Sequence, residues 1–95
     1  MANYRLSNAA KEDLIRIHHY GARQFGMHQA DVYYNTFFEY FEIIAQRPYS
    51  FESVEFIKKG YRRCPCGSYS IYYRIVDDMV DVMAIIGKQD LNNIL

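Results

Sequence analysis

The residues with the most reactive side chains are three histidines and two cysteines. His18, His19 and His28 carry imidazoles, which bind metals or transfer protons near neutral pH. Because consecutive helical residues point about 100° apart, His18 and His19 cannot chelate one ion. Cys64 and Cys66 supply two thiols, whereas a structural zinc site needs about four nitrogen or sulfur ligands. On a strand their Cα atoms would lie near the ~7 Å limit for a disulfide, so we expect reduced, structural cysteines.

The sequence also lacks the strings that usually mark catalysis or cofactor binding. It contains no glycine-rich phosphate loop, no nucleophile elbow and no metal-binding His/Glu spacing. We therefore expect no catalytic residue, no metal and no cofactor.

The charge of the chain is balanced overall but uneven along its length. Eleven basic and eleven acidic residues give a net charge of zero, unlike a strongly basic nucleic-acid binder. Residues 47–74 nevertheless carry six basic side chains and two acidic ones, a net charge of +4. Such a stretch could dock on an acidic partner or a phosphate, or it could form a solvated face of a sheet.

The length and composition fit one domain, residues 1–95. About half of the residues are hydrophobic, and ten Tyr and six Phe supply much of the expected core. No run approaches the ~18 uncharged apolar residues of a membrane span, and residues 1–7 lack the apolar core of a signal peptide. We therefore expect a cytoplasmic protein without membrane contact.

A first amphipathic helix is expected over residues 8–25. Ser7 and Asn8 offer N-cap oxygens, and Glu12 and Asp13 are expected in the first turn, where negative charge stabilises a helix. Apolar residues then recur every three or four positions, at Ala10, Leu14, Ile17, Gly21 and Phe25.

A second helix is expected over residues 27–46, after Gly26 and before Pro48, which ends it. The short connection makes the two helices antiparallel. The apolar stripe of this helix consists of Ala30, Tyr34, Phe37, Phe41 and Ile44. Further aromatic side chains lie off that stripe, at Tyr33, Phe38 and Tyr40. Either the sheet covers them or they form a surface for a partner.

Beyond a connecting segment at residues 48–60, the apolar period changes to two. It predicts strands over 61–66, 69–76 and 79–86, joined by short turns into an antiparallel meander. Pro65 cannot donate to a ladder, which suggests an edge position for the first of them. Strict alternation in the last strand separates Asp81, Met83 and Ile85 from Val80, Val82, Ala84 and Ile86.

The predicted fold class is α+β. A helical hairpin packs on an antiparallel sheet of three to four strands, which the segment Tyr4–Leu6 is expected to join. A short last helix is expected over residues 90–95.

Several strings in this order resemble the RelE/ParE superfamily of toxins. Leu6-Ser7-x-Ala9-Ala10-x-x-Asp13-Leu14-x-x-Ile17 is similar to the opening of ParE toxins. Gly60-Tyr61-Arg62-Arg63 and Gly67-x-Tyr69-x-Ile71-x-Tyr73 resemble the central hairpin of that family, and Gly87-Lys88-Gln89-Asp90 follows the last strand. The resemblance covers essentially the whole chain and implies a RelE/ParE-like fold and a bacterial type II toxin–antitoxin system that stabilises a plasmid or chromosome.

The superfamily contains two activities, which the residues can separate. RelE-type members cut messenger RNA with an Arg of the middle strand, an Arg after the Gly-Lys pair and a Tyr near the C-terminus. Aligned positions here hold Ser70, Gln89 and Leu95, which lack the charge or the proton-transfer group that this chemistry needs. The resemblance thus implies a non-catalytic ParE-type inhibitor of DNA gyrase. The alternatives are a ribosome-dependent mRNA endonuclease and a non-toxic relic that only binds its antitoxin.

The chain also departs from common ParE patterns. Ala84 and Gly87 stand where many ParE chains carry Arg and His, and the net charge is neutral where theirs is often basic. The departures make the transfer of target-contact residues from the family unsafe.

The resemblance implies two protein partners, gyrase and a ParD-type antitoxin that neutralises the toxin in a hetero-oligomer, without sequence-specific nucleic-acid binding. The candidate contacts to the target are Lys58, Lys59, Arg62, Arg63, Arg74, Lys88, Gln89 and Asp90. The candidate contacts to the antitoxin are Leu14, His18, Phe37, Tyr40 and Phe41. For Leu14, Phe37 and Phe41, a place in the core is the better explanation.

Overall fold

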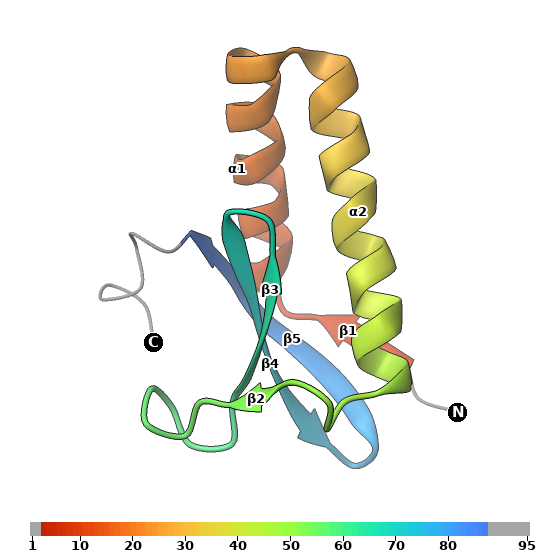
Figure 1. Cartoon of the computed structure of the whole chain (residues 1–95), viewed down its shortest axis with the longest axis vertical. Helices are drawn as coiled ribbons and strands as arrows, with labels where there is room; N and C mark the ends of the chain where they lie inside the picture. The colour runs from red at the N-terminus through yellow and green to blue at the C-terminus, as the bar shows by residue number, and fades with distance from the viewer. Residues whose placement is uncertain (1–2, 88–95) are drawn as a thin grey trace.

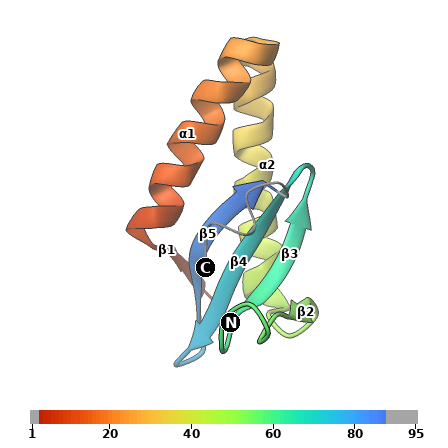
Figure 2. The same cartoon turned by 90° about the vertical axis from the view of Figure 1, so that its left-hand side faces the viewer.

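The computed structural model describes residues 3–87 as two layers, a pair of helices on one face of a sheet (Figures 1 and 2). The elements are β1 (Asn3–Leu6), α1 (Asn8–Phe25), α2 (Met27–Gln46), β2 (Glu52–Ser53), β3 (Arg62–Cys66), β4 (Tyr69–Val76) and β5 (Met79–Gly87). Both helices occupy the predicted ranges, and the three long strands differ from prediction by at most one residue at an end. The expected helix over 90–95 lies outside the described residues.

The sheet has the strand order β1-β5-β4-β3-β2, with β1 and β2 at its opposite edges (Figure 2). Strands β3, β4 and β5 form the predicted antiparallel meander. Strand β1 joins the sheet as expected, but it pairs parallel to β5. The two-residue strand β2 was not predicted; it pairs with Arg62 and Arg63 of β3. Pro65 lies beyond the part of β3 that β2 covers, which is where a missing N–H is tolerated.

Helix α1 begins at a side-chain cap rather than at a cluster of charge. Ser7 is the N-cap, and its Oγ accepts a hydrogen bond from the Ala10 amide at 3.0 Å. The expectation that Glu12 and Asp13 lie in the first turn was wrong, because the helix begins at Asn8 and that turn holds no acidic residue. Asp13 has a different function in the fold: its Oδ2 accepts a hydrogen bond from the Ile85 amide of β5 at 2.9 Å.

Strand β5 contains a bulge at Met83. Its register to β4 passes from Tyr72↔Ala84 to Tyr73↔Val82, so that Met83 has no counterpart. One extra residue reverses the alternation of the side chains that follow it. The prediction that four apolar residues share a face of β5 was therefore wrong. Val80, Val82 and Ile85 face the helices, and Ala84 and Ile86 lie in a cluster on the opposite face.

The segment between β1 and α1 holds this bulge in place. The Ser7 hydroxyl donates to the Met83 carbonyl at 2.9 Å, and the Ser7 amide donates to the Val82 carbonyl at 3.0 Å. The Ile85 amide donates to Asp13, so the backbone groups around the bulge are hydrogen-bonded to Ser7 and Asp13, near the start of the chain. Ser7 and Asp13 thereby fix where the end of β5 and Gly87 lie relative to α1.

Two apolar clusters stabilise the sheet, one on each face. The main core lies under the helices and includes Leu14, Phe37 and Phe41, as the helical periodicity predicted. The aromatics off the helical stripe, Tyr33, Phe38 and Tyr40, are partly buried against this core. A second cluster covers the other face. It consists of Val54, Tyr61, Tyr72, Ala84 and Ile86, with Ile57 and Met83 packed against it.

Within residues 3–87, neither helix is both long and apolar enough to cross a membrane.

Candidate functional site

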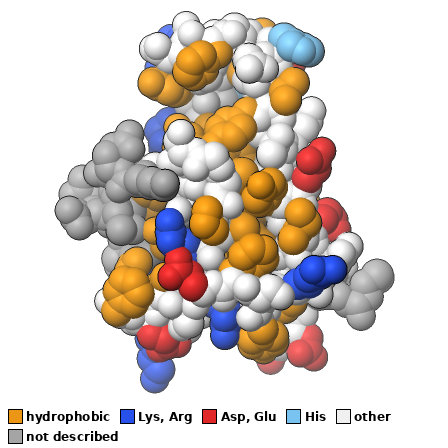
Figure 3. Space-filling view, viewed as in Figure 1, with side chains coloured by type: hydrophobic (Ala, Val, Ile, Leu, Met, Phe, Trp, Pro, Cys, Tyr) orange, Lys and Arg blue, Asp and Glu red, His pale blue; other side chains and the backbone are white. Residues whose placement is uncertain are grey.

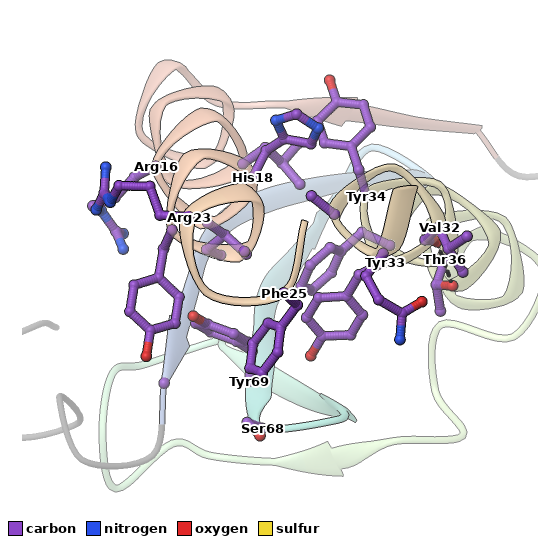
Figure 4. A pocket seen from close by; sticks show the side chains of 18 residues that line it. Arg16, His18, Arg23, Phe25, Val32, Tyr33, Tyr34, Thr36, Ser68 and Tyr69 are labelled. Carbon is purple, nitrogen blue, oxygen red and sulfur yellow. Dashed lines mark hydrogen bonds between the residues drawn. The ribbon is translucent and has the colours of Figure 1, made fainter. Parts of the chain in front are cut away.

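The helical pair extends past the sheet at one end (Figure 1), and a large hollow of the described surface is lined by residues of both helices and of the β3–β4 turn. It has a volume of about 870 Å³ and is bounded by α1, α2 and the turn between β3 and β4. Apolar side chains gather on the face that α2 and this hairpin present (Figure 3). We call this hollow the hairpin groove. Figure 4 shows Phe25, Tyr33, Tyr69 and Ser68 converging on it from both helices and from the hairpin.

The floor of the hairpin groove is aromatic. The ring centroid of Tyr33 lies 4.9 Å from that of Phe37 and 6.1 Å from that of Tyr69, distances at which aromatic rings attract one another. The Tyr33 hydroxyl donates to the Cys66 carbonyl at 2.9 Å, which ties α2 to β3. Burial raises the pKa of Tyr33 to about 12, so this hydroxyl remains a neutral donor at physiological pH.

The hairpin turn is shaped to let Tyr33 approach. Gly67 has a φ of +61°, a conformation that side chains rarely adopt, and a Cβ there would clash with the Tyr33 hydroxyl. Gly67 is therefore required both for the turn and for the contact between the hairpin and α2.

The rim of the hairpin groove combines exposed apolar and cationic side chains. Phe25, at the end of α1, is 70% exposed, and Tyr20 is also exposed. Arg16 and Arg23 lie on α1 at the edge of the groove (Figure 4). A large exposed aromatic beside a concave apolar floor is a surface that a protein partner can cover.

The five antitoxin-contact candidates are distributed between the core and the rim. Leu14, Phe37 and Phe41 are buried in the core, although Leu14 and Phe37 also line the bottom of the groove. His18 lines it from the side of the helices opposite Ser68 and Tyr69 (Figure 4).

His18 and Tyr40 also have contacts of their own. The ring of His18 is hydrogen-bonded to Asp31 at 2.8 Å and meets Tyr34 edge-on. Tyr40 packs against the core and does not line the groove.

Sequence reasoning missed most of the residues that form the groove. Leu14, His18 and Phe37, which were predicted as antitoxin contacts, do line it, and Tyr33 was singled out as lying off the helical stripe. Phe25 was assigned to the buried stripe, and its exposure follows from the extension of the helical pair beyond the sheet. Arg16, Arg23 and Tyr69 carried no signal, because only the tertiary fold brings the hairpin turn under α1.

The predicted basic stretch is not one patch. Arg62 donates to the Phe51 carbonyl at 2.7 Å and its guanidinium lies 5.1 Å from the ring centroid of Tyr49. Arg63, next along β3, donates to the Ser70 hydroxyl at 2.9 Å and forms an ion pair with Glu52. Because neighbouring residues of a strand face opposite ways, the two guanidiniums point to different sides of the sheet.

Arg74 is engaged across the outer face of the sheet. Its Nε lies 3.5 Å from the carboxylate of Asp81, which also forms an ion pair with Arg5 of β1. The Arg5 guanidinium, by its hydrogen bond, holds the pKa of the Asp81 carboxyl below its usual value. The Asp81 carboxylate of β5 thus links its strand to both neighbours, to β1 through Arg5 and to β4 through Arg74.

The remaining target-contact candidates are less constrained. Lys58 is exposed and lies over the Tyr61 ring, 5.7 Å from its centroid, and Lys59 is also exposed. Lys88, Gln89 and Asp90 lie outside the described residues.

Reactive groups are not gathered at any site in the described part of the chain. Ser70 is 2% exposed and accepts the hydrogen bond from Arg63. Cys64 and Cys66 are free and buried, and burial raises the pKa of both thiols to about 11. Among residues 3–87, no three His, Cys, Asp or Glu side chains are grouped so that they could hold a metal ion.

Comparison with known proteins gives concordant matches. A model of the family described as "ParE toxin of type II toxin-antitoxin system, parDE" matches residues 4–91. The chain is 39% identical to Toxin ParE1 of Caulobacter vibrioides over 75 residues, 79% of this chain and 78% of that protein. The chromosomal ParDE TA system from P. aeruginosa shares the fold. Its TM-score is 0.80 at 16% identity, with 92% of this chain and 95% of that chain covered.

Proposed function

The chain belongs to the ParE toxin family of type II toxin–antitoxin systems, and on this premise we propose that it inhibits DNA gyrase and is neutralised by a ParD-type antitoxin. The observation that carries the proposal is the family match, which covers residues 4–91 and so reaches from β1 to beyond β5. The inhibitor traps gyrase with its DNA cleaved, and it acts in the cytoplasm, where gyrase works.

The inhibitor acts by binding and does not catalyse a reaction. RNA cleavage by relatives needs a cation on the middle strand to stabilise charge on the phosphate. The corresponding residue of β4 is Ser70, a buried hydroxyl already engaged by Arg63. Arg63 itself is paired with Glu52, which offsets its charge. These contacts support a binding role for this face rather than phosphate chemistry.

The surface proposed for the target is basic and lies on the β2–β3 side of the sheet. Lys58 and Lys59 project from the loop before β3, and Arg74 stays half-exposed beside Asp81. Charges at the edge of an interface chiefly raise the rate of association and set orientation. Arg63 lies on the outer face of the sheet with Arg74, whereas Arg62 points to the other face, so the proposal retains Arg62 only as a contact at the edge of this surface. Lys88, Gln89 and Asp90 remain proposed contacts that lie outside the described residues.

The antitoxin is proposed to cover the hairpin groove, as an amphipathic helix covers an apolar groove in other complexes. The resulting complex is a hetero-oligomer of toxin and antitoxin. Of the residues predicted as contacts, His18 and Tyr40 are partly exposed, and His18 is the one of these two that lines the groove.

A supercoiling assay with purified gyrase tests the proposed function. The folded chain should inhibit supercoiling at micromolar concentration, and the K58E/K59E variant should inhibit less. The matched control is K11E, at an exposed lysine of α1 that does not belong to the loop. No inhibition by the folded wild type would refute the gyrase proposal.

Cuts within codons of translated messages, mapped by primer extension, would instead identify an mRNA endonuclease. Expression without growth arrest would identify a non-toxic relic.

A further inference from the structure

The loop between β2 and β3 carries the most exposed large apolar side chain of the described residues. This side chain is Phe56, which is 82% exposed. The loop projects from the sheet at the end opposite to the tip of the helical pair (Figures 1 and 2). A single apolar side chain in water is common in proteins, so exposure alone does not indicate a binding site. The order of the loop, a hollow beside Phe56 and two adjacent lysines give this exposure a function.

The backbone of the loop is closed on itself by hydrogen bonds. The Val54 amide donates to the Tyr61 carbonyl at 2.8 Å, and two further amides of the loop donate to the Val54 carbonyl. The Glu55 carboxylate accepts a hydrogen bond from the Gly60 amide at 2.9 Å. Val54 and Tyr61 are both buried in the apolar cluster on the outer face of the sheet, which anchors the two ends of the loop. The backbone that carries Phe56 is therefore ordered before any partner binds, and such a segment loses less conformational entropy on binding.

A hollow on the outer face of the sheet lies beside Phe56 and has a volume of about 200 Å³. The apolar part of its lining consists of Phe56, Val54, Ile57 and Tyr72. Its charged groups are already engaged with one another, because Arg63 donates to the Ser70 hydroxyl and is ion-paired with Glu52. The hollow is thus suited to an apolar side chain of a partner, packed against the ring of Phe56.

Two lysines of the same loop carry positive charge that is not paired within the chain. Lys58 and Lys59 are exposed, and neither forms an ion pair within residues 3–87. Of the two carboxylates nearby, Glu52 is paired with an arginine of β3, and Glu55 is hydrogen-bonded inside the loop. Residues 52–63 hold four basic and two acidic side chains, a net charge of +2. A partner surface that receives this loop is therefore favoured when it is acidic.

We propose that Phe56 is the apolar anchor by which this loop binds gyrase. Its ring inserts into an apolar recess on an acidic surface of the enzyme, an apolar side chain of the enzyme fills the hollow beside it, and Lys58 and Lys59 face carboxylates. The inference rests on the proposed function, because the partner is taken to be gyrase. It adds an uncharged residue to the basic target contacts. Aromatic side chains buried at the centre of an interface supply much of the affinity, whereas charges at the edge chiefly guide the encounter.

The test measures binding of the folded chain to immobilised gyrase by surface plasmon resonance, together with inhibition of supercoiling. F56A should lose affinity by about tenfold or more, mainly through faster dissociation. K58Q/K59Q should lose less, through slower association, and its loss should shrink when salt is raised from about 50 mM to about 500 mM. The loss in F56A should persist at high salt, because the contact that it removes is apolar.

Two controls separate the anchor from effects on the fold. F25A removes a phenylalanine ring that is 70% exposed at the end of α1, outside the loop, and should bind gyrase like wild type. F56L keeps apolar bulk at the tip of the loop and should retain part of the affinity. Because Phe56 is exposed, F56A should unfold at the same urea concentration as wild type.

The outcomes distinguish this inference from the proposed function. If F56A binds and inhibits gyrase like wild type, the anchor is refuted and the gyrase proposal stands on other contacts. If F56A and F25A lose affinity equally, the loss is not specific to the loop and the inference is again overturned. If the folded wild type does not bind gyrase, the proposed function and this inference fail together. If wild type alone sediments as a dimer that F56A dissolves, the loop binds a second copy of the chain, which also overturns the inference.

Discussion

Replacing Asp13 should lower the free energy of unfolding by more than is usual for a residue on the surface of a helix. Its Oδ2 is the acceptor for the amide of Ile85, a residue whose side chain is fully buried. In D13A that amide loses its partner next to the Met83 bulge, and an unsatisfied buried amide costs about 1–3 kcal/mol. Alanine has a higher helix propensity than aspartate, which returns up to about 0.7 kcal/mol. The expected net loss in the free energy of unfolding is about 1–2 kcal/mol.

The measurement is urea unfolding followed by circular dichroism, with thermal melting as a second readout. For a chain of this size, 1 kcal/mol shifts the melting temperature by about 4–8 °C. Two controls isolate the bond to Ile85. R16A removes only the exposed ion pair and should cost about 0.5 kcal/mol or less. D13N retains an oxygen that can accept from the amide and should cost less than D13A. If D13A and R16A lose equal stability, Asp13 contributes only its surface charge, and its role in holding the bulge is refuted.

Four further predictions concern the turn, the thiols and the outer face. G67A should lower the free energy of unfolding by about 1 kcal/mol or more, because Ala disfavours positive φ and its Cβ would clash with the Tyr33 hydroxyl. Chemical unfolding should show that G67A/Y33F loses less stability than the sum of the two single variants. Cys64 and Cys66, with pKa values of about 11, should react with a thiol reagent at pH 8 only when the chain unfolds, and reaction of the native protein within minutes would contradict their burial. Their raised pKa values also predict that stability falls as pH rises from about 9 to 11, since the unfolded thiols ionise first. The lowered pKa of Asp81 predicts that stability falls as the solution becomes acidic. The contribution of the Asp81 carboxylate to the free energy of unfolding is present above the ordinary pKa of 3.8 and is lost as pH falls through the lowered pKa. In D81N, stability should therefore depend less on pH in this acidic range.

The helices could be predicted to the residue because each of their limits has a local cause. Ser7 caps α1, Gly26 separates the helices with a φ of +92°, and Pro48 follows the end of α2. The meander was equally visible, since short turns leave antiparallel pairing as the available solution. The local sequence therefore determined the two helices, the three long strands and most of the main core, but not the short strand β2.

The bulge at Met83 could not be predicted, because β5 has apolar residues on both sides of it. Because all residues from Val82 to Ile86 are apolar, the sequence there is equally compatible with a regular strand and with a bulge. The bulge becomes necessary only through distant partners, the Ser7 hydroxyl and the Asp13 carboxylate. The second core on the outer face follows from it, since the bulge turns Ala84 and Ile86 to that side.

The candidate sites were harder to predict than the fold because a site is a tertiary arrangement. A count of charges along residues 47–74 ignores that side chains alternate between the two faces of a strand, so that Arg62 and Arg63 lie on different faces. It also ignored carboxylates from elsewhere, such as Asp81 beside Arg74. The hairpin groove joins α1, α2 and a turn more than forty residues away along the chain from α1, and no short string records that proximity.

The central claim, a non-catalytic toxin that acts on gyrase, is tested most directly by trapping the cleaved complex. Relaxed plasmid is incubated with gyrase, ATP and the folded chain, then treated with detergent and protease. The expected result is linear DNA that accumulates with toxin concentration, requires gyrase and disappears when the antitoxin is added first. Gyrase that supercoils the plasmid normally and yields no linear DNA at a saturating concentration of folded chain would contradict the claim.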